Sequence, residues 1–378
     1  MKKILITLAV LALSNIANAD HKPEEQYFSG VSYRVQGSDN YQKLETELVD
    51  NKISKLVDKQ LQNQEKTGLA SYVIFSDGKI RINKNKWNDD IKKNKGLLRS
   101  NSMGKSMISY VTGHAVCKYG IDLNAKMNDW AVLNNTLYAD NTLLQVLNMT
   151  SGDHNYIGER KFRGDGYFKG NRNKQINKRT VAESMLWFKG TKKKKENSPY
   201  NYSAMSTHVA INYVIHKVGK DYEKLLKEIF TDHVGVKDTV HFMKVSWSSK
   251  DIAKGSQRYT FFATAEDYIR IGKTLYNDYN SDSCIGDYLR TVYENRVKKK
   301  VKDERITNKH SAAATYEYGG QFHLSYKGMK KKVIFAMDGY AGQQLVIDME
   351  KGTIIHVGSV DQHYNWNKLI YNVMKKGL

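Results

Sequence analysis

Two residues in the stretch from Leu97 to Gly120 have the types and the spacing for acyl-transfer chemistry. Ser102 lies where a helix is expected to begin, and Lys105 follows three residues later, so the hydroxyl and the amine share one helix face. A serine hydroxyl becomes a nucleophile when a neighbouring base takes its proton, and an amine can be that base. The partial positive charge and free N–H groups of a helix start would stabilise the developing oxyanion. The pair predicts acyl transfer through Ser102.

The Ser-x-x-Lys spacing alone is weak evidence, because a lysine-rich chain produces it by chance. A second copy, Ser76 to Lys79, has Asp-Gly between two alternating apolar runs, which is typical of a hairpin turn. Around Ser102, apolar residues recur at helical spacing and small residues fill the other faces, which predicts a buried helix. The apolar set is Met103, Met107, Ile108, Val111 and Ala115, and the small set is Gly104, Ser106, Ser109, Thr112 and Gly113.

Elements on both sides of this helix must position it. Tyr41 to Leu61 has the pattern of an amphipathic helix without visible chemistry, and Gly68 to Asn83 has that of a hairpin leading to the catalytic helix. Helical patterns dominate from about residue 121 to 310, and strand patterns and a closing helix follow them. The expected helices are Thr142 to Met149, Thr180 to Phe188, Met205 to Val218, Tyr222 to Phe230, Thr264 to Tyr276 and Asp361 to Lys375; the expected strands are Tyr318 to Ser325, Lys332 to Met337, Gln344 to Asp348 and Thr353 to Val357.

The N-terminus has the pattern of a secretory signal peptide. Lys2 and Lys3 precede an apolar run from Ile4 to Leu13, and Ala17-Asn18-Ala19 offers small residues for cleavage. The run is too short to span a bilayer as a helix. We expect cleavage near Ala19 and a periplasmic or secreted protein.

The expected domain organisation follows from these patterns. It comprises a signal peptide over residues 1–19, an N-terminal extension with the amphipathic helix over residues 20–66, and a catalytic domain over residues 67–378. Within that domain we expect a sheet lobe at about residues 67–100 and 315–378, and an inserted helical lobe at about residues 101–314.

The chain is strongly basic, with a formal net charge of +21. The lysine runs, 192–195, 298–300 and 330–332, lie in no nucleic-acid recognition motif and have no interleaved aromatic residues, so we expect no specific nucleic-acid partner. We interpret most of these lysines as solvated surface, with a nonspecific attraction to anionic envelope polymers as the expected consequence.

Cys117 and Cys284 are the two cysteines, and the sequence leaves open whether they form a disulfide or stay as buried thiols. The positions of the two cysteines do not resemble a metal site, and we expect no metal and no cofactor. Neither His-Glu-x-x-His nor Gly-x-Ser-x-Gly occurs, which disfavours a zinc peptidase and an α/β-hydrolase. His154 and His208 are candidates for a triad histidine, but a serine–lysine mechanism needs none, and we interpret them as loop and helix residues.

Four segments together resemble the serine β-lactamase-related hydrolases, and most closely the branch of class C β-lactamases, family VIII esterases and 6-aminohexanoate-dimer hydrolases. The segments are Arg99-Ser-Asn-Ser-Met-Gly-Lys-Ser, Leu147-Asn-Met-Thr-Ser-Gly, Tyr200-Asn-Tyr-Ser and Gly339-Tyr-Ala-Gly-Gln. The resemblance implies an α/β (α+β) fold of the β-lactamase/transpeptidase type: an antiparallel sheet with flanking helices, an inserted helical lobe, and the active site between the lobes.

The resemblance also implies roles for individual residues. Ser102 would be acylated, Lys105 would assist its deprotonation, and Tyr202 would act as a general base or proton shuttle, with a Lys105 ammonium stabilising the Tyr202 phenolate. The backbone N–H groups of Tyr340 and Ser102 would form an oxyanion hole, with Gly339 allowing close approach. Gly339, Tyr340 and Gln343 are therefore the expected oxyanion and substrate-binding residues. The alternative for Tyr202 is a structural role, in which the tyrosine only packs under a loop.

Two departures from the family pattern bear on the substrate. Ala204 stands where the second motif has asparagine, and Met337-Asp338-Gly339 stands where β-lactamases have Lys-Thr-Gly. The cation that grips a β-lactam carboxylate is thus missing from its usual position. We expect an exported serine hydrolase for a small ester or amide; the alternatives are a β-lactamase or penicillin-binding peptidase, and a non-catalytic basic envelope binding protein. The oligomeric state is not predicted.

Overall fold

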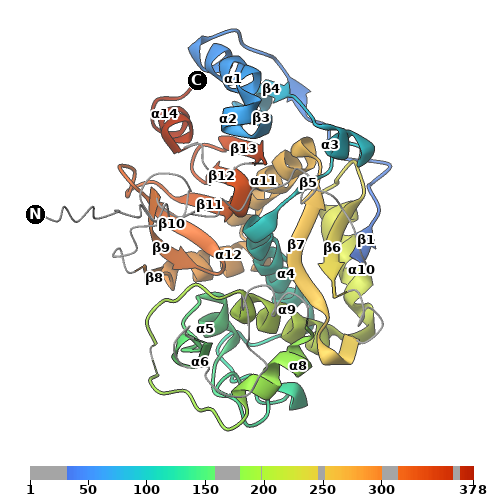
Figure 1. Cartoon of the computed structure of the whole chain (residues 1–378), viewed down its shortest axis with the longest axis vertical. Helices are drawn as coiled ribbons and strands as arrows, with labels where there is room; N and C mark the ends of the chain where they lie inside the picture. The colour runs from blue at the N-terminus through green and yellow to red at the C-terminus, as the bar shows by residue number, and fades with distance from the viewer. Residues whose placement is uncertain (1–31, 158–178, 197, 246–251, 300–313, 361–366) are drawn as a thin grey trace, which may run out of the picture.

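Strands from both ends of the chain meet in one large sheet, and helices cover its two faces (Figure 1). The computed structural model describes residues 32–157, 179–196, 198–245, 252–299, 314–360 and 367–378. The signal peptide expected over residues 1–19 lies outside the described residues, as do residues 361–366 of the expected closing helix. Among the described residues, no helix has the length and apolar character to cross a membrane.

The large sheet has nine strands in the order β2-β4-β3-β13-β12-β11-β10-β9-β8. Neighbouring strands run antiparallel except β2 and β4, and β3 pairs with β13, with Val73 opposite His356. The strands are β2 (Glu45–Thr46), β3 (Leu69–Ser76), β4 (Lys79–Asn85), β8 (Val297–Lys298), β9 (Thr315–Gly319), β10 (Phe322–Tyr326), β11 (Ile334–Gly339), β12 (Gln343–Asp348) and β13 (Ile354–Ser359).

The turns of this sheet follow from local sequence. Asp77 and Gly78 both have positive φ, 52° and 78°, which is the backbone that a two-residue Asp-Gly hairpin turn requires. The hairpin expected over Gly68 to Asn83 is therefore confirmed as β3 and β4. The single strand expected over Tyr318 to Ser325 is wrong, because Gly320 and Gln321, also with positive φ, turn the chain between β9 and β10.

One face of the large sheet packs on the terminal helices α1 (Lys52–Gln62) and α14 (Asn367–Lys376). Val57 of α1 and Ile370 of α14 are fully buried in this layer. The helix expected to start at Tyr41 starts only at Lys52, because the Asn51 side chain accepts the first free N–H groups and ends the preceding extended segment.

The opposite face packs on α11 (Ala265–Tyr279). A Cβ atom on Gly272 would lie only 2.9 Å from a methyl carbon of Ile354, so glycine allows this helix to approach β13 closely. The ring of Tyr268 stacks on His356 of β13 at 4.8 Å between centroids.

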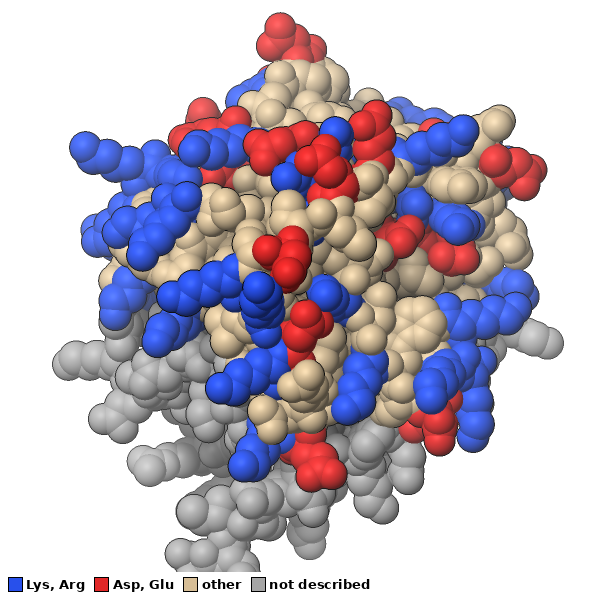
Figure 2. Space-filling model, turned by 90° about the horizontal axis from the view of Figure 1, so that it is seen from above, with Lys and Arg blue, Asp and Glu red and all other residues tan. Residues whose placement is uncertain are grey.

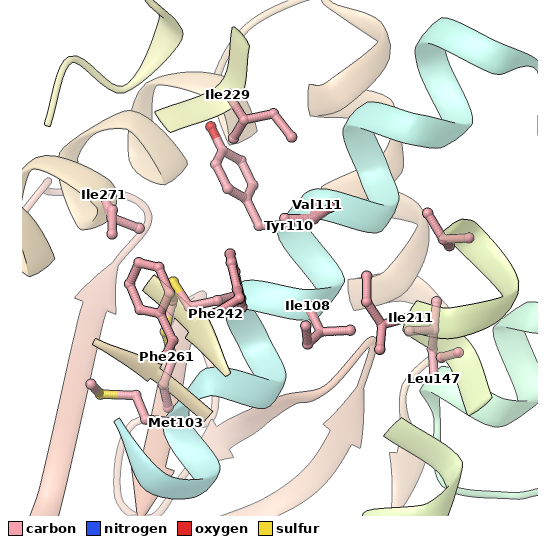
Figure 3. Close-up of a cluster of buried hydrophobic side chains, with 14 of the residues drawn as sticks. Met103, Ile108, Tyr110, Val111, Leu147, Ile211, Ile229, Phe242, Phe261 and Ile271 are labelled. Carbon is pink, nitrogen blue, oxygen red and sulfur yellow. The ribbon is translucent and has the colours of Figure 1, made fainter. Parts of the chain in front are cut away.

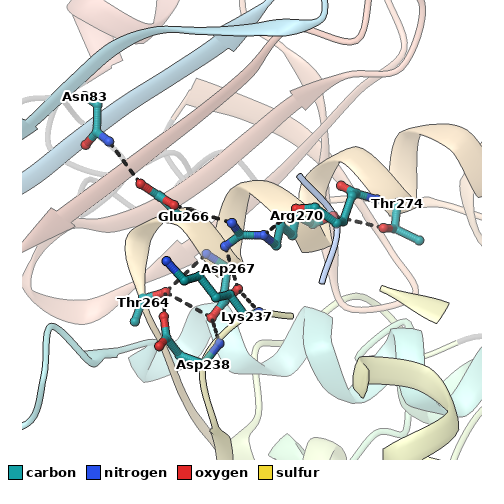
Figure 4. Close-up of polar contacts among 9 residues, drawn as sticks. Asn83, Lys237, Asp238, Thr264, Glu266, Asp267, Arg270 and Thr274 are labelled. Atoms are coloured by element: carbon teal, nitrogen blue, oxygen red, sulfur yellow. Dashed lines mark hydrogen bonds and ion pairs between the residues drawn. The ribbon is translucent and has the colours of Figure 1, made fainter. Parts of the chain in front are cut away.

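A buried ion pair fixes the start of α11 (Figure 4). Asp267 is fully buried, receives an Arg270 Nη1 hydrogen bond at 2.8 Å, and accepts the backbone N–H groups of Lys237 and Asp238. Burial still raises the pKa of Asp267, although these donors oppose the increase. The carboxylate satisfies every donor around it, which is what a buried charge requires.

The buried helix predicted after Ser102 is confirmed as α4 (Gly104–Tyr119), most of whose residues are buried. Met103 and Val111 are fully buried, and they lie in one apolar cluster with Phe242 and Phe261 of a second, four-stranded sheet (Figure 3). That sheet has the order β1-β6-β7-β5. Its strands are β1 (Ser32–Val35), β5 (Leu98–Arg99), β6 (Val240–Lys244) and β7 (Gln257–Ala263).

Residues 101–314, which we expected to form a helical lobe, thus also contribute strands β6, β7 and β8. The helices expected around residues 142, 180, 205, 222 and 264 are all present, with shifted ends. The remaining helices and helical turns are α2 (Gln64–Thr67), α3 (Asp89–Lys93), η2 (Asn101–Met103), η3 (Ala131–Leu133), α5 (Leu143–Leu147), α6 (His154–Ile157), α8 (Val181–Met185), η4 (Leu186–Phe188), α9 (Ala204–Val218), η5 (Gly219–Asp221), α10 (Tyr222–Lys227), η6 (Glu228–His233), η8 (Ile252–Lys254), α12 (Cys284–Glu294) and η10 (Tyr340–Gly342).

Cys117 and Cys284 form a disulfide, with their Cα atoms 5.8 Å apart. The bridge joins the last turn of α4 to the first residue of α12, and of the two alternatives left open by the sequence, the structure has the bonded one.

On the face shown in Figure 2, basic side chains are spread among acidic ones. Each lysine run also has a member held by a specific contact rather than by solvent alone. Lys193 Nζ donates to Gln145 Oε1 at 2.8 Å, and Lys332 Nζ donates to Asp348 Oδ2 at 3.1 Å. Lys299 is buried, and its surroundings belong to the site described next.

Candidate active site

Ser102 and Lys105 lie together at the start of α4, as their spacing predicts. Ser102 is in the 3₁₀ turn η2 and is half-buried, and a hydrogen bond of 3.1 Å joins its Oγ to Lys105 Nζ. Lys105 is 1% exposed, and burial lowers the pKa of its amine well below the ordinary value of 10.5. The neutral amine, which can accept a proton, is therefore favoured beside the hydroxyl.

Strand β7 fixes the backbone of this turn. The Ser100 hydroxyl accepts the N–H of Phe261 at 2.8 Å, and the Ser100 N–H donates to the Phe261 carbonyl at the same distance. A Cβ atom on Gly104 would lie 2.0 Å from the Tyr259 carbonyl oxygen, so only glycine fits there. Asn101 has a φ of 47°, a left-handed conformation that asparagine tolerates better than most residues. These contacts place Ser102 against the end of β7.

Tyr202 comes to the same place from the loop before α9. Asn201 donates its N–H to the Met149 carbonyl at 2.9 Å, and Ser203 caps α9 through the Ser206 N–H. The loop is thus fixed on both sides of the tyrosine. The centre of the Tyr202 ring lies 5.0 Å from Lys105 Nζ.

The phenol of Tyr202 is the protonated partner of the three. Although 44% of the residue surface is exposed, burial of the phenol group raises its pKa well above 10.0. A side-chain hydrogen bond with Ser102 lowers the pKa to a smaller extent. Lys105 as a neutral amine and Tyr202 as a neutral phenol form a base and an acid on either side of Ser102.

Tyr259 of β7 is a member of the site that the sequence does not reveal. Its ring centre lies 3.4 Å from Lys105 Nζ, and its other side stacks on His208 at 5.1 Å between centroids. His208 is fully buried and contacts Arg258 Nη1 at 3.1 Å through Nδ1, so it lies behind Tyr259. His154, the second histidine considered from sequence, begins α6.

The segment from Gly339 to Gln343 closes the site on the side of the large sheet. A Cβ atom on Gly339 would lie 2.2 Å from the Ser100 carbonyl oxygen, and Asn101 Nδ2 donates to the Tyr340 carbonyl at 2.7 Å. Tyr340 is 39% exposed. Gln343, in contrast, is fully buried, and its amide donates to the Ser359 carbonyl, which places it inside the sheet.

A beta-lactamase family model matches residues 53–368 of this chain. The chain belongs to the beta-lactamase family. It is accordingly a hydrolase of a family of serine hydrolases that includes amidases and carboxylesterases. A comparison with curated proteins finds no match.

Solved structures of this family share its fold with the chain. A protein assigned as a 6-aminohexanoate-dimer hydrolase from Bacillus anthracis has a TM-score of 0.61 and 16% identity, over 92% of this chain and 89% of that one. A family VIII carboxylesterase has a TM-score of 0.59 and 13% identity, over 89% and 99%. The D-amino acid amidase from Ochrobactrum anthropi has a TM-score of 0.57 and 17% identity, over 85% and 99%. The β-lactamase/transpeptidase-like fold is therefore confirmed.

Against this beta-lactamase family background, the position of Lys299 is unexpected. Met337 occupies the usual place of the third-motif lysine, and the buried Lys299 amine lies within electrostatic reach of the next residue, Asp338. Lys299 Nζ contacts Thr315 Oγ1 at 2.6 Å and His323 Nδ1 at 3.3 Å, and the His323 ring stacks near Tyr202 at 6.4 Å between centroids. Burial lowers the pKa of Lys299 to about 7, and Asp338 opposes this.

Sequence reasoning missed Lys299 because it lies within a run of three lysines that has the composition of a solvated surface. Lys298 is indeed exposed, but Lys299 is only 6% exposed. The structure thus places a second buried amine near the site, linked to Tyr202 through the His323 ring.

Proposed function

We propose that this protein is an exported serine hydrolase that cleaves a carboxylic ester or amide through an acyl intermediate on Ser102. The observation that carries the proposal is the 3.1 Å hydrogen bond between Lys105 Nζ and Ser102 Oγ, with the lysine almost completely buried. Burial supplies the neutral amine that nucleophilic activation needs, and the half-buried hydroxyl remains open to a substrate.

In the first step, Lys105 takes the hydroxyl proton while Ser102 Oγ attacks the substrate carbonyl carbon. The electron pair of the carbonyl moves to its oxygen, for which the N–H groups of Ser102 and Tyr340 are the proposed donors. When the tetrahedral intermediate collapses, the alcohol or amine leaves with a proton given by Tyr202, which regains one from the Lys105 ammonium. Water then attacks the acyl group by the same route in reverse, releasing the acid and restoring Ser102.

Ser102→Ala is the direct test, assayed with p-nitrophenyl esters and short amides. We expect turnover to vanish with the fold retained, since loss of a first-turn hydroxyl costs only about 0.5 to 2 kcal/mol. Ser76→Ala is the matched control, because Ser76 heads the other Ser-x-x-Lys copy, in β3, and bonds to Asp77. Unchanged hydrolysis in folded Ser102→Ala would end the proposal.

An activity towards penicillins is the second candidate, and the observation that motivates it is the position of Lys299. A cation near the third motif could attract a carboxylate, but Lys299 is buried and faces Asp338. We therefore expect little labelling by a fluorescent penicillin together with clear labelling by a fluorophosphonate. Strong penicillin labelling of Ser102 would favour the β-lactamase or peptidase alternative, and absence of both labels would favour the binding-protein alternative.

Export of the mature protein is part of the proposal. Its support is the N-terminal pattern up to Ala19 and the disulfide, which forms in oxidising compartments. N-terminal sequencing of the secreted or periplasmic protein should find Asp20 or a neighbouring residue first. A full-length chain retained in the cytoplasm with reduced cysteines would contradict it. In the exported protein, the basic surface would attract anionic envelope polymers without specificity.

A further inference from the structure

The far end of the catalytic helix carries a cluster of ligand-type side chains that the proposed reaction does not use. His114 of α4, His233 at the end of η6 and Asp278 near the end of α11 each present a nitrogen or oxygen atom, and these atoms lie within 4.8 Å of one another. His114 is twelve residues after Ser102, which is about 18 Å along a helix. The cluster is therefore separate from the candidate active site.

We propose that His114, His233 and Asp278 form a binding site for a divalent transition-metal ion, with Zn²⁺ as the reference ion. Two imidazoles and one carboxylate suit zinc and its neighbours, and they leave a fourth position for water. Since the three residues come from separate elements, no short sequence motif announces the site.

His114 supplies the first argument. Its Nε2 is buried and has no hydrogen-bond partner among the described residues, which is an unfavourable state for a polar atom unless something occupies the space beside it. The imidazole ring is held by Tyr110, 4.7 Å away in an edge contact, and lies 5.3 Å from the His233 ring. A metal ion would give this nitrogen a partner.

Asp278 supplies the second argument. Tyr110 donates its hydroxyl to Asp278 Oδ2 at 2.5 Å, and His233 Nε2 lies 2.9 Å from Oδ1. A ligating carboxylate that is oriented by an outer hydrogen bond is the arrangement found around bound metals. On metal binding, His233 would ligate through Nε2 as a neutral imidazole, so a protonated ring would release its Nε2 proton to solvent and a neutral ring would carry its proton on Nδ1.

The backbone around His233 supplies the third argument. His233 ends a π-helical segment, Glu228–His233, and such turns are rare and occur frequently at functional sites. The His233 side chain is 42% exposed, so an ion has a path from solvent and room for a water ligand. Tetrahedral zinc places ligand atoms about 3.4 Å apart, so His114 must move inward by roughly an ångström. Both cysteines are in the disulfide and do not compete.

The test is zinc binding to the untagged, disulfide-intact protein by equilibrium dialysis and titration calorimetry after treatment with a chelator. We expect one zinc ion per chain and a higher melting temperature with zinc than with chelator. The single substitutions His114→Gln and His233→Asn should each weaken zinc binding by at least roughly 10-fold. His216→Asn is the matched control, because His216 is an exposed histidine on α9.

Alternative variants and a spectroscopic measurement keep the test decisive. If His114→Gln fails to fold, His114→Phe keeps the aromatic contact with Tyr110 and removes the ligand atom. Bound Co²⁺ should show the intense visible bands of a tetrahedral site, and His114→Phe should abolish them. No zinc binding by the wild type, or equal binding by the wild type and the folded His114 and His233 variants, would overturn the proposal. In either case the cluster would be an ion pair of His233 and Asp278 alone.

Discussion

Two buried lysines are linked to Tyr202, Lys105 directly and Lys299 through the His323 ring, and the difference between their surroundings separates a base from a cation. Lys105 is 1% exposed and lies beside a hydroxyl and two aromatic rings, and burial alone lowers the pKa of its amine. Lys299 is 6% exposed, but Asp338 opposes the effect of burial and leaves a pKa of about 7. Loss of water makes a proton acceptor of one lysine, and a carboxylate keeps the other one charged over part of the pH range.

Lys105→Arg should break this comparison most completely. A guanidinium keeps its proton at any working pH and is too large for the enclosed start of α4, so the site loses its base. We expect ester turnover to fall by about 10⁴-fold, the upper range for lost acid–base catalysis. The measurement is kcat with a p-nitrophenyl ester. Lys118→Arg, an exposed position on the same helix paired with Glu228, is the control; a variant at position 105 with a tenth of the wild-type rate would contradict the base assignment.

Tyr202→Phe tests whether the Tyr202 phenol is the proton donor of the site. The change removes only the phenol oxygen and keeps the ring that packs near His323 and Tyr318. We expect the maximal rate to fall by about 10²- to 10⁴-fold with little change in melting temperature. Rate and melting temperature should be measured on one preparation. A normal rate with a lower melting temperature would show that Tyr202 only packs, and another proton donor would then be needed.

The pH dependence of the unfolding free energy tests the lowered pKa of Lys299. The folded-state pKa of Lys299 is about 7, below the unfolded value of 10.5, so the unfolded chain binds more protons between these pH values and the wild type gains stability as pH rises. Lys299→Met lacks this titration, so its unfolding free energy does not rise in the same way. The difference in unfolding free energy between Lys299→Met and the wild type should therefore shrink by roughly 2 kcal/mol between pH 7.5 and 9. Urea unfolding at the two pH values measures it. A difference that stays constant with pH would mean that Lys299 remains charged in the folded protein.

Lys299→Met should have the smallest effect on catalysis. Lys299 contacts His323, whose ring stacks near Tyr202, so we regard Lys299 as a positioning residue. We expect kcat/KM to fall about 10-fold, equivalent to ~1.4 kcal/mol, and to the same extent for a neutral ester and for one that carries a carboxylate. The measurement is KM and kcat for one anionic and one neutral ester. A larger loss for the anionic ester would show that Lys299 recognises substrate charge and would contradict a purely positioning role.

The two lysines also show which parts of a site are visible in sequence. Lys105 could be predicted, because its partner Ser102 is one helical turn away and local spacing determines whether they meet. Lys299 could not, since its surroundings come from β9, β10 and β11 and depend on sheet pairing. Tyr259 was missed for the same reason: only the pairing of β5 with β7 brings it to α4.

The same distinction applies to the fold. Local signals predicted the β3–β4 hairpin, from Asp77-Gly78, and the helix α9, from its apolar run. Long-range features were not predicted. Strands β6 and β7 lie in a range with mostly helical patterns, and their aromatic residues fit either a strand or a buried helix until the four-stranded sheet is known.

The pairing of β3 with β13 has a consequence for how the molecule is made. β3 ends at Ser76 and its partner β13 begins at Ile354, so the centre of the large sheet is joined only by residues synthesised near the end of the chain. Until then the β3 edge next to β13 is open, and an open edge invites pairing with other chains. A chain cut short before Ile354 would expose that edge permanently. Truncated protein should therefore aggregate, and only a nearly complete chain can assemble the site around Ser102.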